Sequence, residues 1–231
     1  MSEAKPAFDA TSTGMIYIKI PVGMLQCNCS ILGDPVTREA IVVDPGDEVG
    51  RILDLLGRHK LTVKAIISTH AHIDHIGGLS RLHQCTGAPV MIHRDDLPLY
   101  KGLDEQAAFL GMPTPEMAEI DHLLREGDPL RWGSYEARVI HTPGHTPGSV
   151  CLYMPKDPSN VTVPVPQLFA GDTLFAGSIG RTDLWGGSME QILASLRGKL
   201  MELPDETIVY PGHGPATTIG RERDSNPFLI R

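Results

Sequence analysis

The chain has few cysteines, few aromatic residues and no long apolar run. Its 231 residues include four cysteines and 5% aromatic residues, within a hydrophobic fraction of 41%. No segment approaches the roughly 20 apolar residues that span a bilayer, and the first residues lack the apolar core of a signal peptide. Neither a CxxC pair nor a secreted disulfide framework can be built from Cys27, Cys29, Cys85 and Cys151. We therefore expect a soluble, cytoplasmic protein.

The chain has fewer basic than acidic residues, which restricts its partners. Lys and Arg total 20 against 28 Asp and Glu, so the net charge is -8. This charge repels phosphate backbones, so nucleic acid is not expected as a partner. Because the chain has no apolar span, a membrane is not expected as a partner either. A domain of this size removes about 70% of its unfolded surface from water and needs no disulfide bonds. We expect one domain over residues 14–231 after a flexible tail, residues 1–13.

Short apolar, β-branched runs closed by Gly, Pro, Asp or His alternate with helical patterns, which predicts an α/β fold. The predicted helices are Val49–His59, His75–Cys85, Pro115–Leu124 and Met189–Leu203. The predicted strands are Met15–Val22, Cys29–Leu32, Glu39–Val43, Val63–Ser68, Val90–His93, Ala137–His141, Val150–Met154, Gln167–Ala170 and Thr207–Tyr210. Lys156–Pro166 and Arg94–Trp132 are interpreted as insertions. For the second, a mobile lid and two small surface helices are both open interpretations.

One turn of the chain concentrates potential metal ligands. The predicted strand Val63–Ser68 continues into a segment with the pattern HxHxDH, so three histidines and one aspartate stand within six residues. Residues two apart in an extended backbone point the same way, so His70 and His72 can converge on one ion. Asp74 and His75 turn with the start of the next helix and can face a second ion. Because desolvated imidazoles and carboxylates need partners, the cluster predicts a metal site.

Three further ligand candidates follow predicted strands. His145 lies in a rigid Pro/Gly turn, Asp172 directly follows an apolar strand, and His213 follows the last predicted strand. In α/β folds the ends of strands are where binding and catalytic residues gather. We therefore expect these three side chains to complete the site.

The order of these residues resembles that of a known family. The HxHxDH turn, followed by His145, Asp172 and His213, is similar to the metallo-β-lactamase superfamily from about Met15 to the C-terminus. The resemblance implies an αββα sandwich with the site along one edge, between the two sheets. It also implies a dinuclear centre in which His70, His72 and His145 bind one metal, Asp74, His75 and His213 bind the other, and Asp172 bridges the two.

A centre of this kind would make water reactive at neutral pH. Bound zinc lowers the pKa of water towards about 7, so a metal-bound hydroxide can attack a carbonyl. Two divalent ions outweigh the negative charges of Asp74, Asp172 and the hydroxide, and the residual positive charge stabilises the oxyanion. We expect Asp74 and Asp172 to be catalytic residues. These ligands suit zinc, iron and manganese alike, with zinc as the first expectation.

Within the superfamily the chain resembles glyoxalase II and its shorter bacterial relatives. The resemblance implies a thioester hydrolase, with S-lactoylglutathione as the first expected substrate. It places Arg181 where these enzymes carry a cation that contacts glutathione. The alternative interpretation of Arg181 is a structural ion pair with Asp183. The motifs that carry the resemblance are Gly171–Phe175, Gly180–Asp183, Tyr210–Pro215, Glu222 and Asn226–Phe228.

Two differences from full-length glyoxalase II leave the substrate open. Of the 231 residues only eighteen follow His213, so we expect the helical C-terminal domain that helps to hold glutathione to be absent. Asp183 also stands where a tyrosine usually follows the cation. A broader or different thioester is therefore the second expectation.

Other functions compete with thioester hydrolysis. Glutathione persulfide dioxygenases share the HxHxDH turn, the Gly-Arg-Thr-Asp stretch and a single domain. They hold a single iron, which would lie here on His70 or His72 with His145 and Asp172. A metal-stabilised binding protein without catalysis is a third hypothesis. β-Lactam hydrolysis is less favoured because the second metal position uses Asp172 rather than a cysteine, and RNA processing because of the net charge.

The remaining histidines and the paired cysteines favour structural roles. Cys27 and Cys29 are expected to be small buried side chains rather than a disulfide. Ligating residues need orienting partners, and His141 is the histidine expected to take such a role. No ligand partners stand close in sequence to His59, His83, His93, His122 and His141.

Overall fold

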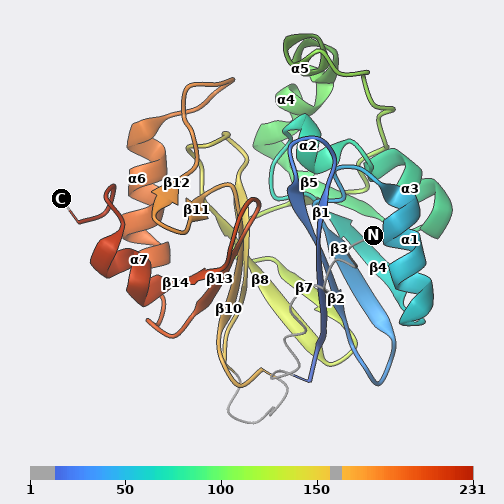
Figure 1. Cartoon of the computed structure of the whole chain (residues 1–231), viewed down its shortest axis with the longest axis horizontal. Coiled ribbons are helices and arrows are strands. Elements are labelled where there is room, and N and C mark those ends of the chain that lie inside the picture. Colours follow the sequence, from blue (N-terminus) through green and yellow to red (C-terminus); the bar gives the residue numbers. More distant parts are fainter. Residues whose placement is uncertain (1–13, 157–162, 231) are drawn as a thin grey trace, which may run out of the picture.

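The computed structural model describes residues 14–156 and 163–230, and its first six strands pair into one sheet in chain order. β1 to β3 are antiparallel, whereas β3 to β6 are parallel, which brings the ends of β3, β4 and β5 to one edge (Figure 1). These strands are β1 (Ile16–Val22), β2 (Cys27–Gly33), β3 (Glu39–Val43), β4 (Thr62–Ile67), β5 (Val90–His93) and β6 (His122–Leu124).

The second sheet is built by the later part of the chain, in the order β14-β13-β10-β9-β8-β7. β10 and β13 are parallel neighbours, so the residues that follow them emerge at the same edge. A short ribbon of β11 (Leu174–Phe175) and β12 (Ser178–Ile179) follows β10. The strands of the sheet are β7 (Pro129–Trp132), β8 (Tyr135–His141), β9 (Val150–Met154), β10 (Gln167–Gly171), β13 (Ile208–Pro211) and β14 (Thr217–Thr218).

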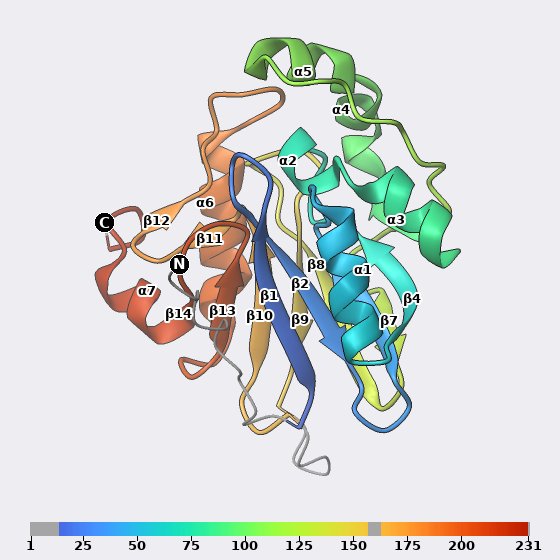
Figure 2. The same cartoon turned by 45° about the vertical axis from the view of Figure 1, so that its right-hand side comes forward.

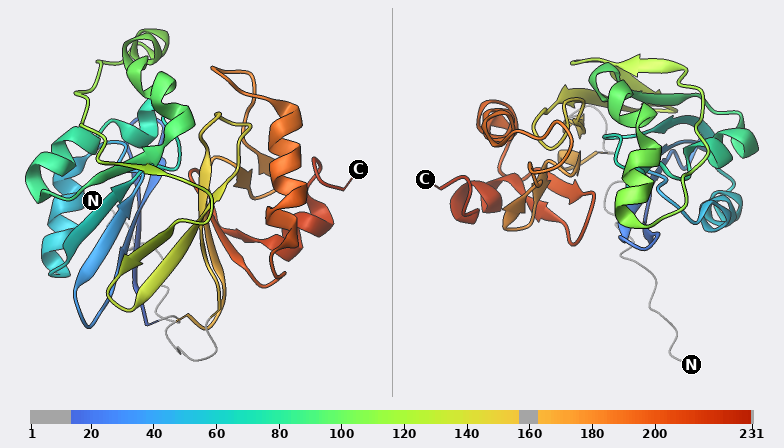
Figure 3. Two further views of the ribbon diagram at one scale, coloured as in Figure 1. Left: turned by 180° about the vertical axis from the view of Figure 1, so that it is seen from behind. Right: turned by 90° about the horizontal axis from the view of Figure 1, so that it is seen from above.

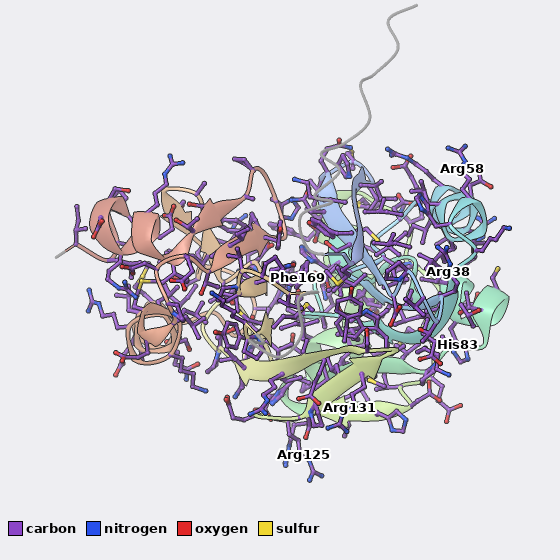
Figure 4. The ribbon with its side chains drawn as sticks, turned by 90° about the horizontal axis from the view of Figure 1, so that it is seen from below. Arg38, Arg58, His83, Arg125, Arg131 and Phe169 are labelled. Atoms are coloured by element: carbon purple, nitrogen blue, oxygen red, sulfur yellow. The ribbon has the colours of Figure 1, made fainter. Side chains whose placement is uncertain are left out.

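Apolar side chains fill the space between the two sheets. Tyr17 from β1 contacts Phe169 from β10 and Tyr210 from β13, with ring centroids 5.7 and 4.6 Å away. Trp132 from β7 is completely buried in the same layer. Figure 4 shows Phe169 in the interior and Arg125 at the periphery. The burial of these rings fixes how the two sheets face each other, and with them the strand ends that carry the site.

Helices cover the outer face of each sheet (Figures 2 and 3). α1 (Val49–Arg58) and α3 (Leu79–Thr86) pack on the first sheet through Ile52, Leu56 and Leu82. α6 (Met189–Gly198) and α7 (Ile219–Ser225) pack on the second through Ile192, Leu196 and Ile219. The chain is therefore a single-domain αββα sandwich, as predicted. No helix of the described segments is long and apolar enough to cross a membrane.

Three short helices lie above the edge where the strands of the first sheet end. They are α2 (Ile73–Ile76), α4 (Leu97–Lys101) and α5 (Leu103–Leu110). Single 3-10 turns at Arg94–Asp96 and Leu200–Glu202 precede α4 and follow α6. α4 and α5 stand above α2 in Figure 1, over the edge that carries the HxHxDH turn.

Two of the predicted helices need correction. His75–Cys85 is interrupted at Gly77 and Gly78, which pack against the turn after β3 and divide the segment into α2 and α3. Pro115–Leu124 contains no helix. The Tyr100 hydroxyl accepts a hydrogen bond from the Ala118 amide and donates one to its carbonyl, and β6 pairs with β5. Tertiary hydrogen bonds thus override the helical pattern of this segment.

The boundaries of the expected insertions also change. Arg94–Trp132 is partly framework, because β6 and β7 within it each pair with a sheet strand. All nine predicted strands are present, with ends shifted by at most two residues. The tail, residues 1–13, lies outside the described residues, as does 157–162 of the insertion Lys156–Pro166.

Candidate metal centre

The HxHxDH turn joins the end of β4 to α2. The chain is extended at His72, which is the N-cap residue of α2, and Asp74 and His75 lie in the helix itself. The turn after β3 packs directly on this helix, because a Cβ atom on Gly46 would overlap the Asp74 carbonyl. His70 and His72 therefore leave an extended segment, whereas Asp74 and His75 leave a helix, so the two pairs of ligands point in different directions, as the sequence predicts.

Three histidines form the first group of ligands. The Nε2 atoms of His70 and His145 lie 3.2 Å apart, and the His72 ring lies 4.6 Å from the His145 ring. One nitrogen of each ring lies within 4.8 Å of the others, and all three side chains are buried. The structure thus brings together the histidines that the resemblance assigns to one metal, although His145 comes from the opposite sheet.

A second group forms beside the first. His213 Nε2 lies 3.2 Å from Asp74 Oδ2 and 3.2 Å from His75 Nε2. Asp172 faces both groups: its Oδ1 atom lies 3.4 Å from His75 Nε2, and its Oδ2 atom lies 3.7 Å from His145 Nε2. This placement, at the end of β10 between the two groups, is the one that a bridging carboxylate needs.

Asp44, which the sequence analysis did not single out, orients two of the ligands. It follows β3, and its carboxylate accepts hydrogen bonds from the Thr69 amide (2.7 Å) and hydroxyl (2.8 Å). His75 Nδ1 donates to the same carboxylate at 3.0 Å, and His70 Nδ1 donates to the Thr69 hydroxyl at 3.1 Å. Both rings therefore direct their Nε2 atoms towards the centre. The sequence does carry a signal for Asp44, because this carboxylate directly follows the apolar strand β3.

Asp96 is a second carboxylate that the sequence analysis missed. It is completely buried, and it accepts hydrogen bonds from the Ala71 amide (2.8 Å), the Thr146 hydroxyl (2.9 Å) and the Gly148 amide (2.6 Å). It thereby connects the HxHxDH turn with the turn that carries His145. Gln106 from α5 anchors the same loop by accepting from the Ile73 amide. Asp96 was not predicted as a functional residue because it lies in Arg94–Trp132, which was interpreted as an insertion.

The protonation of the first group favours metal binding. Burial, followed by repulsion between neighbouring imidazoles, lowers the pKa of His70 and brings that of His72 to about 3. Burial also lowers the pKa of His145, against the opposing attraction of Asp172. These rings are thus neutral at pH 7, the form in which histidine binds a metal. Only deprotonated ligands bind cations, so no proton has to be displaced from these three.

The second group is arranged around negative charge. Burial opposes the charged form of His75, but Cys27, Asp172, Asp74 and Asp44 together raise its pKa well above the usual value. Burial likewise opposes ionisation of Asp74, but His75 and His213 hold the pKa of its carboxyl below the ordinary range. In the absence of a metal this half of the site retains a proton between its imidazoles and carboxylates, which a bound cation would replace.

Atoms without partners indicate that the residues fit a metal centre. His72 Nε2 and Asp172 Oδ1 are buried and have no hydrogen-bond partner within the described chain. Such atoms are costly to bury unless they bind something. The Nε2 atoms of His70 and His145, 3.2 Å apart, also place acceptor against acceptor, because the Nδ1 atoms of both rings donate elsewhere. Divalent cations satisfy all of these atoms at once, because imidazole and carboxylate are good ligands for zinc, iron and manganese.

The side chain of Arg181 forms an ion pair with Asp183, which was one of the two interpretations of this residue from the sequence. Its Nε and Nη2 atoms donate to the two carboxylate oxygens of Asp183, both at 2.7 Å. The backbone carbonyl of Arg181 accepts a hydrogen bond from His145 Nδ1 at 2.8 Å. The residue therefore orients a ligand through its backbone, while its exposed guanidinium stays at the rim of the site.

A third cluster, His93 with Asp95 and His141, lies close by but is shaped as a structural element. The two imidazoles stack at 4.0 Å with an angle of 15°, so their in-plane lone pairs cannot point at one ion. His141 Nε2 donates to the Pro147 carbonyl at 2.9 Å, which holds the turn that carries His145. The expected orienting role of His141 is thus indirect. Cys27 and Cys29 are buried and free, as predicted.

Comparisons with known proteins show the family of the chain. The family model of the metallo-β-lactamase superfamily matches residues 22–213. The chain is 36% identical over 212 residues to hydroxyacylglutathione hydrolase GloC of Haemophilus influenzae, covering 91% of this chain and 96% of that protein.

Two solved structures share the fold at higher identity. BLEG-1, a B3 metallo-β-lactamase, superposes with a TM-score of 0.84 at 40% identity and covers 94% of this chain and all of its own. The di-iron-bound form of TTHA1623 superposes with a TM-score of 0.78 at 40% identity, covering 92% of this chain and all of its own. The family match and the convergence of strand-end histidines and aspartates lead to one conclusion: the chain belongs to the metallo-β-lactamase superfamily.

Proposed function

We propose that the chain hydrolyses thioesters, with S-lactoylglutathione as the first candidate substrate, at a centre of two divalent metal ions, zinc being the first expected metal. The observation that carries the proposal is the position of Asp172, whose two oxygens face the two groups of ligands. The similarity to a hydroxyacylglutathione hydrolase supports the choice of substrate. Bound divalent ions lower the pKa of water towards about 7 and polarise a carbonyl, which is the chemistry that thioester hydrolysis needs.

The residues of this chain have separate tasks in that reaction. His70, His72 and His145 would hold one ion, Asp74, His75 and His213 the other, and Asp172 would contact both. Asp44 holds Nδ1 of His75 protonated, so that Nε2 faces the site. Because Asp74 stays ionised, its Oδ2 atom can accept a hydrogen bond from the attacking water and orient it. Two carboxylates do not neutralise two divalent ions, so the developing oxyanion meets net positive charge.

Arg181 is proposed to bind the glutathione part of the substrate. Its guanidinium is 57% exposed at the rim and is paired only with Asp183 among the described groups. Such an exposed pair contributes little to stability and can open to a substrate carboxylate at small cost. We therefore expect Arg181 to exchange Asp183 for a carboxylate of glutathione when substrate binds.

The proposal is tested by steady-state kinetics of the metal-replete protein on S-lactoylglutathione and on a simple thioester that lacks glutathione. Arg181→Ala is expected to raise KM for the glutathione thioester about tenfold, the effect of losing one exposed charged hydrogen bond, with little change for the simple thioester. Equal effects on both substrates would remove the binding role of Arg181. No turnover of either thioester would contradict the proposed function.

Two other reactions are kept as outcomes of the same experiment. The similarity to a di-iron-bound protein leaves iron open as the native metal, and with it the dioxygenation of persulfides by a mononuclear iron site. One iron per chain, with oxygen uptake that depends on persulfide, would favour that reaction. The similarity to a B3 metallo-β-lactamase makes a β-lactam the appropriate third substrate. A protein that binds metal but turns over none of these would be a binding protein.

A further inference from the structure

A cavity of about 280 Å³ lies between α4, α5 and the loop that joins β12 to α6. It is lined by Leu99 of α4, by Gly102 between the two helices, and by Pro147 and Trp185 from two loops. In Figures 1 and 2 this loop rises opposite α5 at the edge of the sandwich that carries the metal centre. Binding sites for whole ligands usually measure about 300–1,000 Å³, so this cavity has the size for one arm of a substrate.

The walls of the cavity are continuous with the metal centre. The Trp185 ring lies 6.2 Å from the ring of His72, and Pro147 is two residues after His145. Gln106 also lines the cavity and binds the backbone on both sides of His72, since it donates to the Ala71 carbonyl and accepts from the Ile73 amide. A substrate whose reacting carbonyl meets the first group of ligands can therefore extend one arm into the cavity.

The charges around the cavity select which arm enters. Asp95 and Glu105 line it, and no lysine or arginine does so among the described residues. Arg181, which is proposed to hold glutathione, does not line the cavity. Glutathione has a net negative charge at neutral pH, so these carboxylates repel it, whereas an uncharged acyl group meets the apolar faces of Leu99 and Trp185.

An aromatic contact adjoins the cavity at Trp185. The Phe109 ring of α5 meets the Trp185 ring edge to face, with centroids 5.4 Å apart, although 64% of Phe109 is exposed to solvent. Exposing a phenylalanine costs free energy that apolar contact with a ligand would recover. The Phe109 ring therefore adds exposed apolar surface next to Trp185, which lines the cavity.

We propose that this cavity binds the acyl arm of the thioester, and that glutathione thioesters of uncharged, apolar acyl groups longer than lactoyl are better substrates than S-lactoylglutathione itself. This inference rests on the proposed function and specifies its substrate class. The glutathione arm remains outside, at the rim that carries Arg181. Each methylene group that enters the cavity should then strengthen binding by roughly three- to fourfold, until the cavity is full.

The first test measures binding without turnover. Isothermal titration of the metal-replete protein with S-methyl-, S-butyl- and S-hexylglutathione, which contain no bond to hydrolyse, should show affinity rising at least tenfold from methyl to hexyl. Equal affinity for the three thioethers would overturn the inference. The same series of acyl groups in thioesters should give a parallel rise in kcat/KM.

A variant that fills the cavity tests its location. Gly102 has ordinary backbone angles, and an added Cβ would meet only the Pro98 and Leu99 carbonyls at 3.6 and 3.7 Å, so Gly102→Leu can be accommodated. It should abolish the advantage of hexyl over methyl while leaving S-methylglutathione binding unchanged. Gly50→Leu, in α1 with nothing within 4 Å, is the matched control and should retain the full advantage.

Separate outcomes distinguish this inference from the proposed function. If Gly102→Leu does not fold, Leu99→Glu places a charge in the lining of the same cavity and should remove the hexyl advantage. Retention of that advantage in a folded cavity variant would overturn the inference. Fast hydrolysis of lactoylglutathione with no gain for longer acyl groups would overturn it and leave the proposed function standing. Tight binding of S-hexylglutathione without hydrolysis of any thioester would contradict the function and support the cavity.

Discussion

Single buried carboxylates determine how the ligands of this centre are held. Asp44 fixes the protonation of His75 and, through Thr69, of His70. Asp96 connects the two turns on which His72 and His145 stand, by accepting hydrogen bonds from both. Burial raises the pKa of Asp96, because the hydrogen bonds that it accepts do not compensate fully for lost hydration. Neither carboxylate belongs to the two groups of ligands described above, yet each determines where a ligand points.

Asp96→Asn tests this positioning role. An amide keeps the size of the side chain but replaces one acceptor oxygen by a donor, which then faces the donors from Ala71 or Gly148. We expect metal affinity to fall about 10- to 100-fold, the usual effect of losing an orienting partner. Competition with a chromophoric chelator measures the affinity, and circular dichroism checks that the fold persists.

The control for that experiment is Asp104→Asn, an exposed carboxylate of α5. It changes the net charge by the same amount without touching either turn. Equal losses of affinity in both variants would show that overall charge, rather than the position of Asp96, determines the effect.

At the scale of elements, the close approach of α2 to the turn after β3 positions Asp74 and His75. Gly78 donates its amide hydrogen to the Pro45 carbonyl at 2.9 Å, and Gly46 leaves room for the Asp74 carbonyl. Only residues without a Cβ atom permit this contact. The helix is one turn long, so tertiary contacts rather than helix propensity stabilise it.

Gly46→Ala should therefore displace α2. The added methyl group would overlap the Asp74 carbonyl, and relieving such overpacking typically costs about 1–3 kcal/mol of stability. Urea denaturation measures the loss, which should be accompanied by weaker metal binding. Gly50→Ala, where nothing lies within 4 Å, is the comparison, and it should leave stability unchanged or slightly raised. Equal stability of the two variants would show that the close packing at Gly46 is not needed.

The elements also show what the sequence could and could not predict. β-Branched runs closed by turn residues located every strand that supplies a ligand, because burial of those strands is a local property of the sequence. The prediction of a helix over Pro115–Leu124 was wrong because the hydrogen bonds that hold this segment join Ala118 to Tyr100, which is not a local neighbour in the sequence. Asp44, Asp96 and Trp185 were missed because their partners lie far away in the chain, whereas the four ligands of the HxHxDH turn are adjacent.

For the whole molecule, burial of histidines between the sheets and their loops makes stability depend on pH. His93, at the end of β5, is 6% exposed, and burial together with His141 brings its pKa to about 4, below the usual 6.5. Its neutral form is therefore favoured in the folded state. Between these two values the unfolded chain binds the proton and the folded chain does not, so stability is lost as the pH falls from about 6.5 to about 4.

Replacing His93 with glutamine should remove this part of the pH dependence. The contribution of His93 is on the order of 3 kcal/mol over that interval, at 1.36 kcal/mol for each unit of pKa. Urea denaturation of the unmodified protein and of His93→Gln between pH 4 and pH 7 measures it as a difference in slope, in which the other histidines cancel. Parallel curves would contradict the account of His93.

We infer that residues from both sheets act as one site for two metal ions. Elemental analysis of the protein after dialysis in metal-replete buffer tests it directly, with Asp172→Ala measured alongside. We predict two tightly bound ions per chain in the unmodified protein and the loss of both from Asp172→Ala. One ion or none in the unmodified protein, or two ions retained by Asp172→Ala, would contradict it.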